Sequence, residues 1–198
     1  MNLTKKQNAA VIGMILGDAY LQPTGKRNAR LRLEQKADHK DYLKWKTAFL
    51  PQLFQGEPII LERMHPFTKK IYRYVRQQSN ASPILGKLRK LFYPDGKKHI
   101  PENLEKFFRD DITLAICFYD DGYYYRRDKC SYIYLGKISA NEAKIASEAI
   151  NKKFKIRSKI LNKKNKGFVL YFSSEESKKI KKILENYFVP VMAYKIPF

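Results

Sequence analysis

The sequence contains one internal repeat, and this repeat limits the folds that the chain can adopt. Residues 9–19 form an apolar, helix-like stretch that runs into Asp18. Residues 112–122 form a second such stretch, about half a chain length later, that runs into Asp121. The sequence therefore predicts two halves, each opened by an apolar helix that leads to an aspartate.

The ends of the two halves also match. Residues 92–101 and 188–197 each contain an aromatic-x-Pro sequence, followed by a lysine just ahead of an Ile-Pro pair. This match makes Lys98 and Lys195 counterparts. Two matches in the same order indicate a duplication, which singles these two out from the other lysines.

Hydrophobic periodicity between these landmarks predicts the same element order in both halves. In the first half, Leu31 and Leu33 alternate with Arg30, Arg32 and Glu34, as in a strand with one buried face. The predicted elements there are a hairpin at 19–35 with a turn near Thr24–Asn28, a helix at 38–54, strands at 57–63 and 70–77, and a helix at 82–92. In the second half they are strands at 123–126 and 131–136, a helix at 140–153, strands at 155–161 and 167–172, and a helix at 175–187.

This order predicts an α+β fold, with an αββαββα unit present twice. Asp38 is expected to cap the helix at 38–54, and Pro51 is expected to bend or end it. The predicted units are a first half at 1–93, a connecting segment at 94–110 and a second half at 111–198. The join around Asp95-Gly96 and residues 97–101 is too short for a flexible linker, so we expect the halves to pack tightly.

The charge balance indicates a polyanionic partner. The chain has 40 Lys and Arg residues against 19 Asp and Glu residues, which gives a net charge of +21. Such an excess favours nucleic acid, because each neutralised phosphate releases counterions. An anionic membrane surface is the alternative, but no long basic amphipathic helix is present to bind one. A lysine-rich composition inherited from an AT-rich genome is the simpler explanation of the charge, and the charge alone does not exclude it.

The two cysteines, Cys117 and Cys130, support neither a disulfide framework nor a zinc site. No apolar stretch is typical of a signal peptide or a membrane span. We therefore expect an intracellular protein that is not secreted, and the sequence leaves open whether its compartment is a bacterial cytoplasm or an organelle matrix.

The paired helices predict a metal site. Gly13 and Gly17 share one helix face and allow another helix to approach closely. Side-by-side packing of the two helices would bring Asp18 and Asp121 together at their ends. Adjacent carboxylates repel each other, and a divalent cation such as Mg²⁺ relieves this repulsion.

Such a site fits a nuclease, in which a metal activates water and stabilises the leaving oxygen. Lys98 and Lys195 could then stabilise the charge of the transition state or hold the attacking water. The simpler interpretation is that each aspartate is only a polar helix end, and its symmetric repetition weakens that interpretation. A solvated surface role for the lysines stays open. His39, His65 and His99 lack ligand-like spacing, which suggests structural or DNA-facing roles.

Two segments of the sequence resemble the signature motifs of a known family. Residues 11–19 (VIGMILGDA) and 114–122 (LAICFYDDG) resemble the two signature motifs of LAGLIDADG homing endonucleases, in particular the omega-type, intron-encoded mitochondrial branch. The segments at 98–104 and 190–197 resemble that branch as well. The resemblance covers nearly the full chain, from Ala9 to Pro197.

The resemblance implies a pseudo-two-fold monomer in which two antiparallel four-stranded sheets form a saddle over DNA, with the paired motif helices at its centre. It implies magnesium-dependent cleavage of both strands at a long site, leaving short 3′ overhangs, and manganese is expected to substitute. It assigns metal binding to Asp18 and Asp121, with the backbone carbonyls of Gly17 and Asp120 nearby, and a supporting catalytic role to Lys98 and Lys195.

The second motif departs from the family pattern. It has Ile116 and Asp120 where the first motif has Gly13 and Gly17. Asp120 could therefore compete with Asp121 as the metal ligand. The alignment of Asp121 with Asp18 favours Asp121.

Polar side chains on the predicted hairpins are candidates for DNA contact, because arginine can recognise guanine edges and lysine mostly meets phosphate. Strand alternation alone does not separate them from solvated side chains. The candidates are Gln22, Lys26, Arg27, Asn28, Arg30, Arg32, Glu34, Lys69, Lys70, Tyr72, Arg73, Tyr74, Arg76, Tyr123, Tyr125, Arg126, Arg127, Lys129, Asn162, Lys163, Lys164, Asn165 and Lys166.

Three functions fit the sequence. The favoured one is a monomeric, site-specific double-strand DNA endonuclease of intron homing, with a long DNA site and no membrane as partner. The second is a maturase that binds its host intron RNA, and the third is a catalytically silent DNA-binding regulator. The intact pair of Asp18 and Asp121 argues against the third function, whereas the sequence does not separate the first two.

Overall fold

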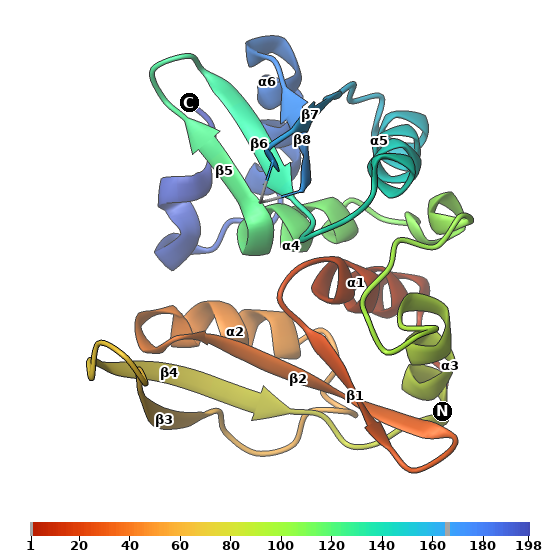
Figure 1. Cartoon of the computed structure of the whole chain (residues 1–198), viewed down its shortest axis with the longest axis vertical. Coiled ribbons are helices and arrows are strands. Elements are labelled where there is room, and N and C mark those ends of the chain that lie inside the picture. Colours follow the sequence, from red (N-terminus) through yellow and green to blue (C-terminus); the bar gives the residue numbers. More distant parts are fainter. Residues whose placement is uncertain (1, 165–166) are drawn as a thin grey trace.

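The structure is a computed structural model that describes residues 2–164 and 167–198, and it contains the predicted unit twice (Figure 1). The first half consists of α1 (Lys5–Leu16), β1 (Tyr20–Thr24), β2 (Asn28–Lys36), α2 (Lys40–Thr47), β3 (Ile59–Met64), β4 (Ile71–Gln78) and α3 (Pro83–Phe92). The second consists of α4 (Ile112–Asp121), β5 (Gly122–Tyr125), β6 (Cys130–Tyr134), α5 (Ala140–Phe154), β7 (Lys159–Asn162), β8 (Phe168–Phe172) and α6 (Ser174–Glu185). Short 3₁₀ helices lie at η1 (Ala37–His39), η2 (Leu104–Phe107) and η4 (Pro190–Lys195).

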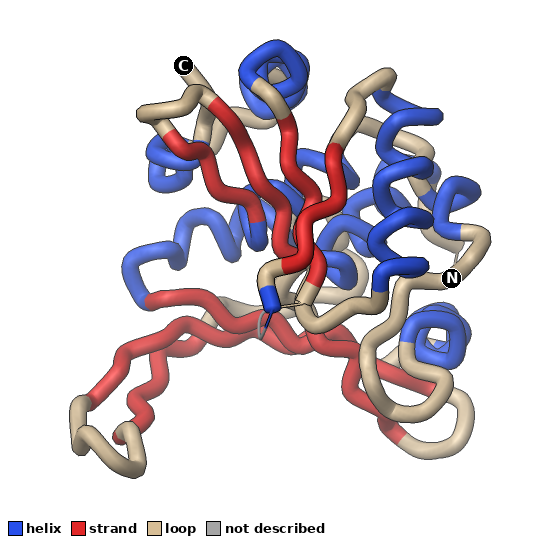
Figure 2. Tube along the Cα trace, turned by 45° about the horizontal axis from the view of Figure 1, so that its top comes forward, coloured by secondary structure: helices blue, strands red, loops and turns tan. Residues whose placement is uncertain are grey.

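Each half forms one four-stranded antiparallel sheet, and the two sheets have the same strand order. The orders are β1-β2-β4-β3 and β5-β6-β8-β7, and Figure 2 shows the sheets as two separate groups of strands. In β2, Leu31 and Leu33 are buried against the helices while Arg30 and Arg32 lie on the opposite face. The predicted α+β fold with two four-stranded antiparallel sheets is confirmed.

Helices α1 and α4 pack side by side at the centre (Figure 1). A Cβ atom on Gly13 would lie 2.8 Å from the Thr113 carbonyl oxygen and 3.0 Å from the Ile116 Cβ. A Cβ atom on Gly17 would collide with the side chain of Asp120. Both glycines therefore allow a helix contact at backbone distance, as the sequence predicted.

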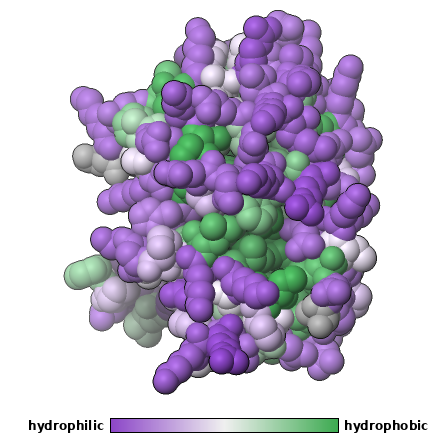
Figure 3. Space-filling view, turned by 90° about the vertical axis from the view of Figure 1, so that its right-hand side faces the viewer, coloured by the Kyte–Doolittle hydropathy of each residue, from purple (hydrophilic) through white to green (hydrophobic). Residues whose placement is uncertain are grey.

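The two halves share one hydrophobic core, to which both contribute buried side chains. The connecting segment adds Leu104 and Phe108, which are also buried. Seen from the side of α3 and α5, the surface is largely hydrophilic, with hydrophobic side chains gathered in its middle (Figure 3). Among the described residues, no helix has the length and apolar character needed to cross a bilayer.

Two predicted elements differ from the structure. Helix α2 is shorter than the predicted 38–54, because Asp38 belongs to η1 and makes no capping hydrogen bond, and the helix ends at Thr47, ahead of Pro51. Strand β7 begins at Lys159 rather than at residue 155. The cause is Lys155, which ends α5 in a left-handed conformation (φ 56°) and turns the chain before the strand starts.

Candidate active site

Asp18 and Asp121 lie at the ends of the paired helices. Asp18 directly follows Gly17, which ends α1, and Asp121 is the last residue of α4. Burial and the neighbouring charge of Asp18 raise the pKa of Asp121 to about 7. Burial, followed by the charge of Asp120, raises the pKa of Asp18 above its ordinary value. These shifts are those of carboxylates that share one partly desolvated site.

Each helix end is held by one lysine. Lys98 Nζ donates hydrogen bonds to the carbonyl oxygens of Leu16 (2.7 Å) and Gly17 (2.8 Å). Lys195 Nζ donates to those of Tyr119 (2.6 Å) and Asp120 (2.8 Å). The two lysines thus occupy matching positions beside the carboxylates, and burial lowers the pKa of both.

The side chain of Asp120 is occupied by protein partners. Its Oδ1 accepts hydrogen bonds from Tyr42 Oη (2.8 Å) and Lys46 Nζ (2.8 Å), and the side chains of Lys46 and Asp120 are fully buried. Its Oδ2 accepts from the backbone N–H of Asp18 at 3.3 Å. This arrangement argues against Asp120 as a competitor of Asp121 for a metal, and leaves its backbone carbonyl as its contribution to the centre.

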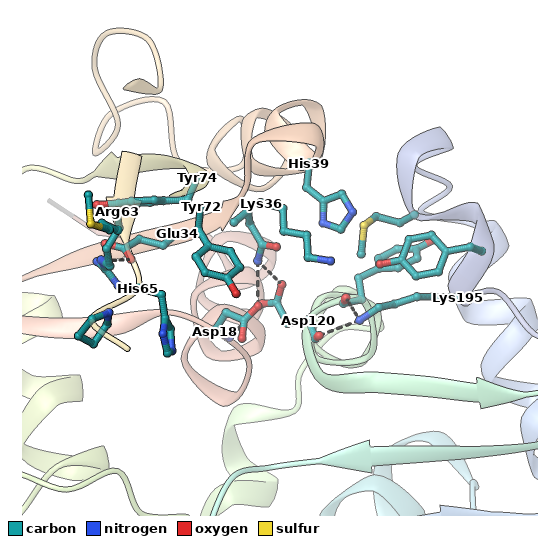
Figure 4. A pocket seen from close by; sticks show the side chains of 16 residues that line it. Asp18, Glu34, Lys36, His39, Arg63, His65, Tyr72, Tyr74, Asp120 and Lys195 are labelled. Carbon is teal, nitrogen blue, oxygen red and sulfur yellow. Dashed lines mark hydrogen bonds and ion pairs between the residues drawn. The ribbon is translucent and has the colours of Figure 1, made fainter. Parts of the chain in front are cut away.

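A cavity of about 610 Å³ opens beside Asp18, Asp120 and Lys195. Gln35 lines the cavity, and its amide nitrogen donates to Asp18 (2.9 Å) and Asp120 (3.3 Å), the two carboxylates labelled in Figure 4. Gln35 was not among the predicted site residues. The sequence held a signal for it, namely a polar residue at a position that alternation assigns to the buried face of β2. Arg63 and Tyr194, which also line the cavity, were missed as well. His39 lines it too, and a structural or DNA-facing role is expected for this residue from the sequence.

Most predicted DNA contacts of the first sheet lie on the face that carries no helices. Their side chains alternate with the buried Leu31, Leu33 and Val75. Glu34 accepts hydrogen bonds from Arg32 (2.8 Å) and Arg76 (2.7 Å), and thereby orders two guanidinium groups. The residues on this helix-free face are Gln22, Arg30, Arg32, Glu34, Tyr72, Tyr74 and Arg76, together with the unpredicted Arg63.

The remaining candidates of the first half lie in turns or directly beside them, with one exception. Lys26 and Arg27 belong to the β1–β2 turn, next to Asn28, and Lys69 and Lys70 belong to the β3–β4 turn. Arg73 is the exception, since it shares the face of Val75 and forms an ion pair with Glu62 (3.4 Å). Strand alternation therefore turns Arg73 away from the helix-free face.

The second sheet presents tyrosines on its helix-free face. Tyr123 pairs with Tyr132 across the strands, and Tyr132 pairs with Tyr171. Tyr125 and Tyr134 belong to the same face, whereas Tyr124, Ile133 and Leu170 point to the core. Tyr132, Tyr134 and Tyr171 were missed in the sequence.

The loops of the second half account for its other candidates. Arg126, Arg127 and Lys129 are exposed at the β5–β6 turn. Asn162, a predicted DNA contact, also shapes a turn, because its Oδ1 accepts the backbone N–H of Lys164 (2.8 Å). Lys163 and Lys164 are exposed beside it. Asn165 and Lys166 lie outside the described residues.

The other two histidines make hydrogen bonds within the protein, and His65 also lines the cavity. His99 lies between Asp95 (2.9 Å) and Glu142 (3.2 Å) and ties the connecting segment to α5. His65 accepts the backbone N–H of Thr68 in the β3–β4 turn.

A family model described as the LAGLIDADG DNA endonuclease family matches residues 8–180. The chain belongs to the LAGLIDADG DNA endonuclease family. This membership confirms the resemblance found in the motifs and the predicted class of DNA-cleaving hydrolase.

Relatives of the family cover nearly the whole chain. A probable intron-encoded endonuclease 1 from Wickerhamomyces canadensis is 26% identical, over 99% of this chain and 86% of its own length. The solved structure of the homing endonuclease I-WcaI bound to its DNA recognition sequence matches with a TM-score of 0.89 at 25% identity, over 100% of this chain and 88% of that one. The structure of an I-DmoI variant with its target DNA in the presence of manganese matches with a TM-score of 0.56 at 18% identity, over 94% and 98% of the two chains.

Proposed function

We propose that this LAGLIDADG protein is a monomeric, site-specific homing endonuclease that cuts both strands of a long DNA site and leaves short 3′ overhangs. One observation carries the proposal: two carboxylates and two lysines are arranged with matching geometry at the junction of the two four-stranded sheets. The names of the relatives, an intron-encoded endonuclease and a homing endonuclease bound to its recognition sequence, support intron homing as the biological setting.

The donor atoms at the junction fit magnesium, with manganese as a substitute. Within residues 2–164 and 167–198 there is no cluster of three or more His, Cys, Asp or Glu side chains able to hold a metal. Two carboxylates, with waters and phosphate oxygens completing the coordination, suit Mg²⁺, which keeps much of its hydration. When bound, the metal supplies charge stabilisation and an activated water.

The protein residues divide the remaining work. Asp18 and Asp121 would hold the metal, with the backbone carbonyl oxygens of Gly17 and Asp120 close to the two carboxylates. Lys98 and Lys195 keep positive charge next to the carboxylates, where negative charge develops on the phosphate. Because each half contributes one aspartate and one lysine, each strand of the duplex meets one set.

A cleavage selection on a randomised plasmid library, with Mg²⁺ present, tests the proposal. We expect cutting at one long site with 3′ overhangs, retention of activity with Mn²⁺, and loss of activity with a chelator. Asp18→Asn and Asp121→Asn should each lower cutting at least about a hundredfold while DNA binding persists. Asp41→Asn, an exposed carboxylate on α2, is the matched control and should cut normally.

Two outcomes would contradict the proposal. Binding of a folded intron RNA without cleavage of any DNA site would indicate a maturase. Tight binding of a DNA site that is never cut, with any divalent metal, would indicate a silent regulator.

A further inference from the structure

The two halves of the candidate active site differ at one position. The repeat aligns Gly17 of the first motif with Asp120 of the second. The first motif has no side chain at this position, whereas the second motif has a fully buried carboxylate. A third carboxylate therefore lies beside Asp18 and Asp121, where it adds negative charge to a site that already holds two.

Helix α2 supplies the compensation. Lys46 Nζ lies 2.8 Å from Asp120 Oδ1, and neither side chain is exposed to solvent. Tyr42, one turn earlier on the same helix, donates its hydroxyl to the same oxygen at 2.8 Å. Its ring also lies beneath the ammonium group, with the nitrogen 4.6 Å from the ring centroid. A buried lysine needs such a partner, so this pairing fixes the position of Asp120.

Asp120 also contacts Asp18. Its second oxygen accepts the backbone N–H of Asp18 at 3.3 Å. Gln35 bridges the two residues, donating to Asp18 Oδ2 at 2.9 Å and to Asp120 Oδ1 at 3.3 Å (Figure 4). Lys46 and Tyr42 are therefore connected to the backbone of Asp18 through Asp120, and to its carboxylate through Asp120 and Gln35.

Asp121 lacks the equivalent network. An equivalent network around Asp121 would require a side chain at position 17 of the first motif, and Gly17 has none. Tyr20 pairs with Arg32 in the first sheet, and Tyr123 pairs with Tyr132 in the second. The residue of the second half that corresponds to Gln35 of β2 is therefore Leu135, just after β6. Leu135 is apolar and buried. In the part of the chain that the structure describes, the carboxylate of Asp121 accepts no side-chain hydrogen bond like that of Asp18.

We propose that Lys46 and Tyr42 are positioning residues that act through Asp120 on Asp18 alone, so that the two strand cuts depend on them unequally. The proposal rests on the proposed endonuclease function. It assigns α2, which carries no predicted site residue, to one of the two cleavage events. The cut that depends on Asp18 requires the network, and the other cut does not.

The experiment follows each strand separately, on the site recovered from the cleavage selection. Lys46→Met removes the cation but keeps the length of the side chain. We expect it to slow one strand at least about tenfold more than the other, so that nicked duplex accumulates. Lys46→Met with Asp120→Asn removes both charges and should bring the two rates back to within about threefold. Tyr42→Phe should slow the same strand by a smaller factor.

The matched control is Lys44→Met, which removes an exposed lysine of the same helix that pairs with Glu57. It should leave both strand rates unchanged. A titration of Mn²⁺ into the protein–DNA complex, followed by electron paramagnetic resonance of the free ion, gives a second readout. Lys46→Met should weaken Mn²⁺ binding, and the double variant should restore it.

Equal slowing of both strands by Lys46→Met, without recovery in the double variant, would overturn the proposal. If Lys46→Met does not fold, Tyr42→Phe and the double variant decide in its place, and equal strand rates in Tyr42→Phe, with Mn²⁺ binding in the double variant well below that of the wild type, would overturn it. A wild-type protein that cuts no site refutes the proposed function instead, so the two failures are distinguishable.

Discussion

The carboxyl group of Asp121 holds its proton to a much higher pH than an ordinary aspartate does. Burial and the charge of Asp18 raise its pKa from 3.8 to about 7. The folded protein therefore binds this proton up to about pH 7, while the unfolded chain releases it near pH 4. Stability consequently falls as the pH rises between these two values and stays low above them.

Asp121→Asn should therefore stabilise the metal-free protein in a pH-dependent way. At pH 8 the variant lacks the buried charge, and its free energy of unfolding should exceed that of the wild type by about 1–3 kcal/mol. The difference should shrink as the pH approaches 4.5, where the wild-type carboxyl is protonated. Urea unfolding with a chelator present measures this, and a difference that does not change with pH would refute the explanation.

Some residues of the candidate active site could be predicted from the sequence and others could not, for a physical reason. Asp18, Asp121, Lys98 and Lys195 could be found because each is repeated, and a repeat is visible without coordinates. Lys46 could not, because its partner Asp120 is distant in sequence and an isolated lysine on an amphipathic helix normally faces water. Only the packing of α2 against α4 turns that lysine into a buried ion pair.

At the scale of elements, the contact between α1 and α4 determines where the two aspartates lie. The contact depends on Gly13, whose Cβ would meet the Thr113 carbonyl oxygen and the Ile116 Cβ. The Thr113 carbonyl is backbone and cannot rotate away. The second helix has Ile116 at the aligned position, so the interface pairs a large residue with a small one rather than two glycines.

Gly13→Ala should destabilise the protein even though alanine favours helix. The helix propensity gain is about 1 kcal/mol, whereas the forced separation of the helices should cost about 1–3 kcal/mol beyond that gain. Chemical denaturation measures the change, and activity should fall as the aspartates move apart. Lys5→Ala, at an exposed position of the same helix, is the control and should change stability by less than about 0.5 kcal/mol. An unchanged or more stable Gly13→Ala variant would show that the helices can adjust freely.

Strand faces were predictable where a strand alternates clearly between apolar and charged residues. In β2, Leu31 and Leu33 separate cleanly from the arginines, and the structure agrees. In β6, the sequence CSYIY has no charged residue, so the face of its tyrosines could not be assigned. The length of α2 was overestimated because the apolar spacing of the helix continues past Thr47. The chain forms a turn there, in which Leu50 and Leu53 are buried as they would be on a helix.

At the scale of the whole molecule, a duplicated backbone carries two different surfaces. The helix-free face of the first sheet holds four arginines, two of them ordered by Glu34. The corresponding face of the second sheet holds five tyrosines, several of them in ring contact with one another. The net charge of +21 supplies attraction to phosphate that does not depend on sequence. We therefore expect the recognition of bases to differ between the two halves of the DNA site.

The two half-sites should accordingly differ in how strictly they are recognised. Arginine forms paired hydrogen bonds with guanine, whereas tyrosine offers a ring for thymine methyl groups and one hydroxyl. The cleavage selection should show strong preferences, including guanine, in the half-site under the first sheet and weaker preferences in the other.

Arg76→Ala should relax the preference at one position in the first half-site, at a cost of about 1–3 kcal/mol in binding. Arg73→Ala is the matched control, because this side chain leaves the same strand on the opposite face and pairs with Glu62. If Arg73→Ala altered base preference as much as Arg76→Ala, or if both half-sites were equally strict, the helix-free faces could not be the surfaces that distinguish the bases.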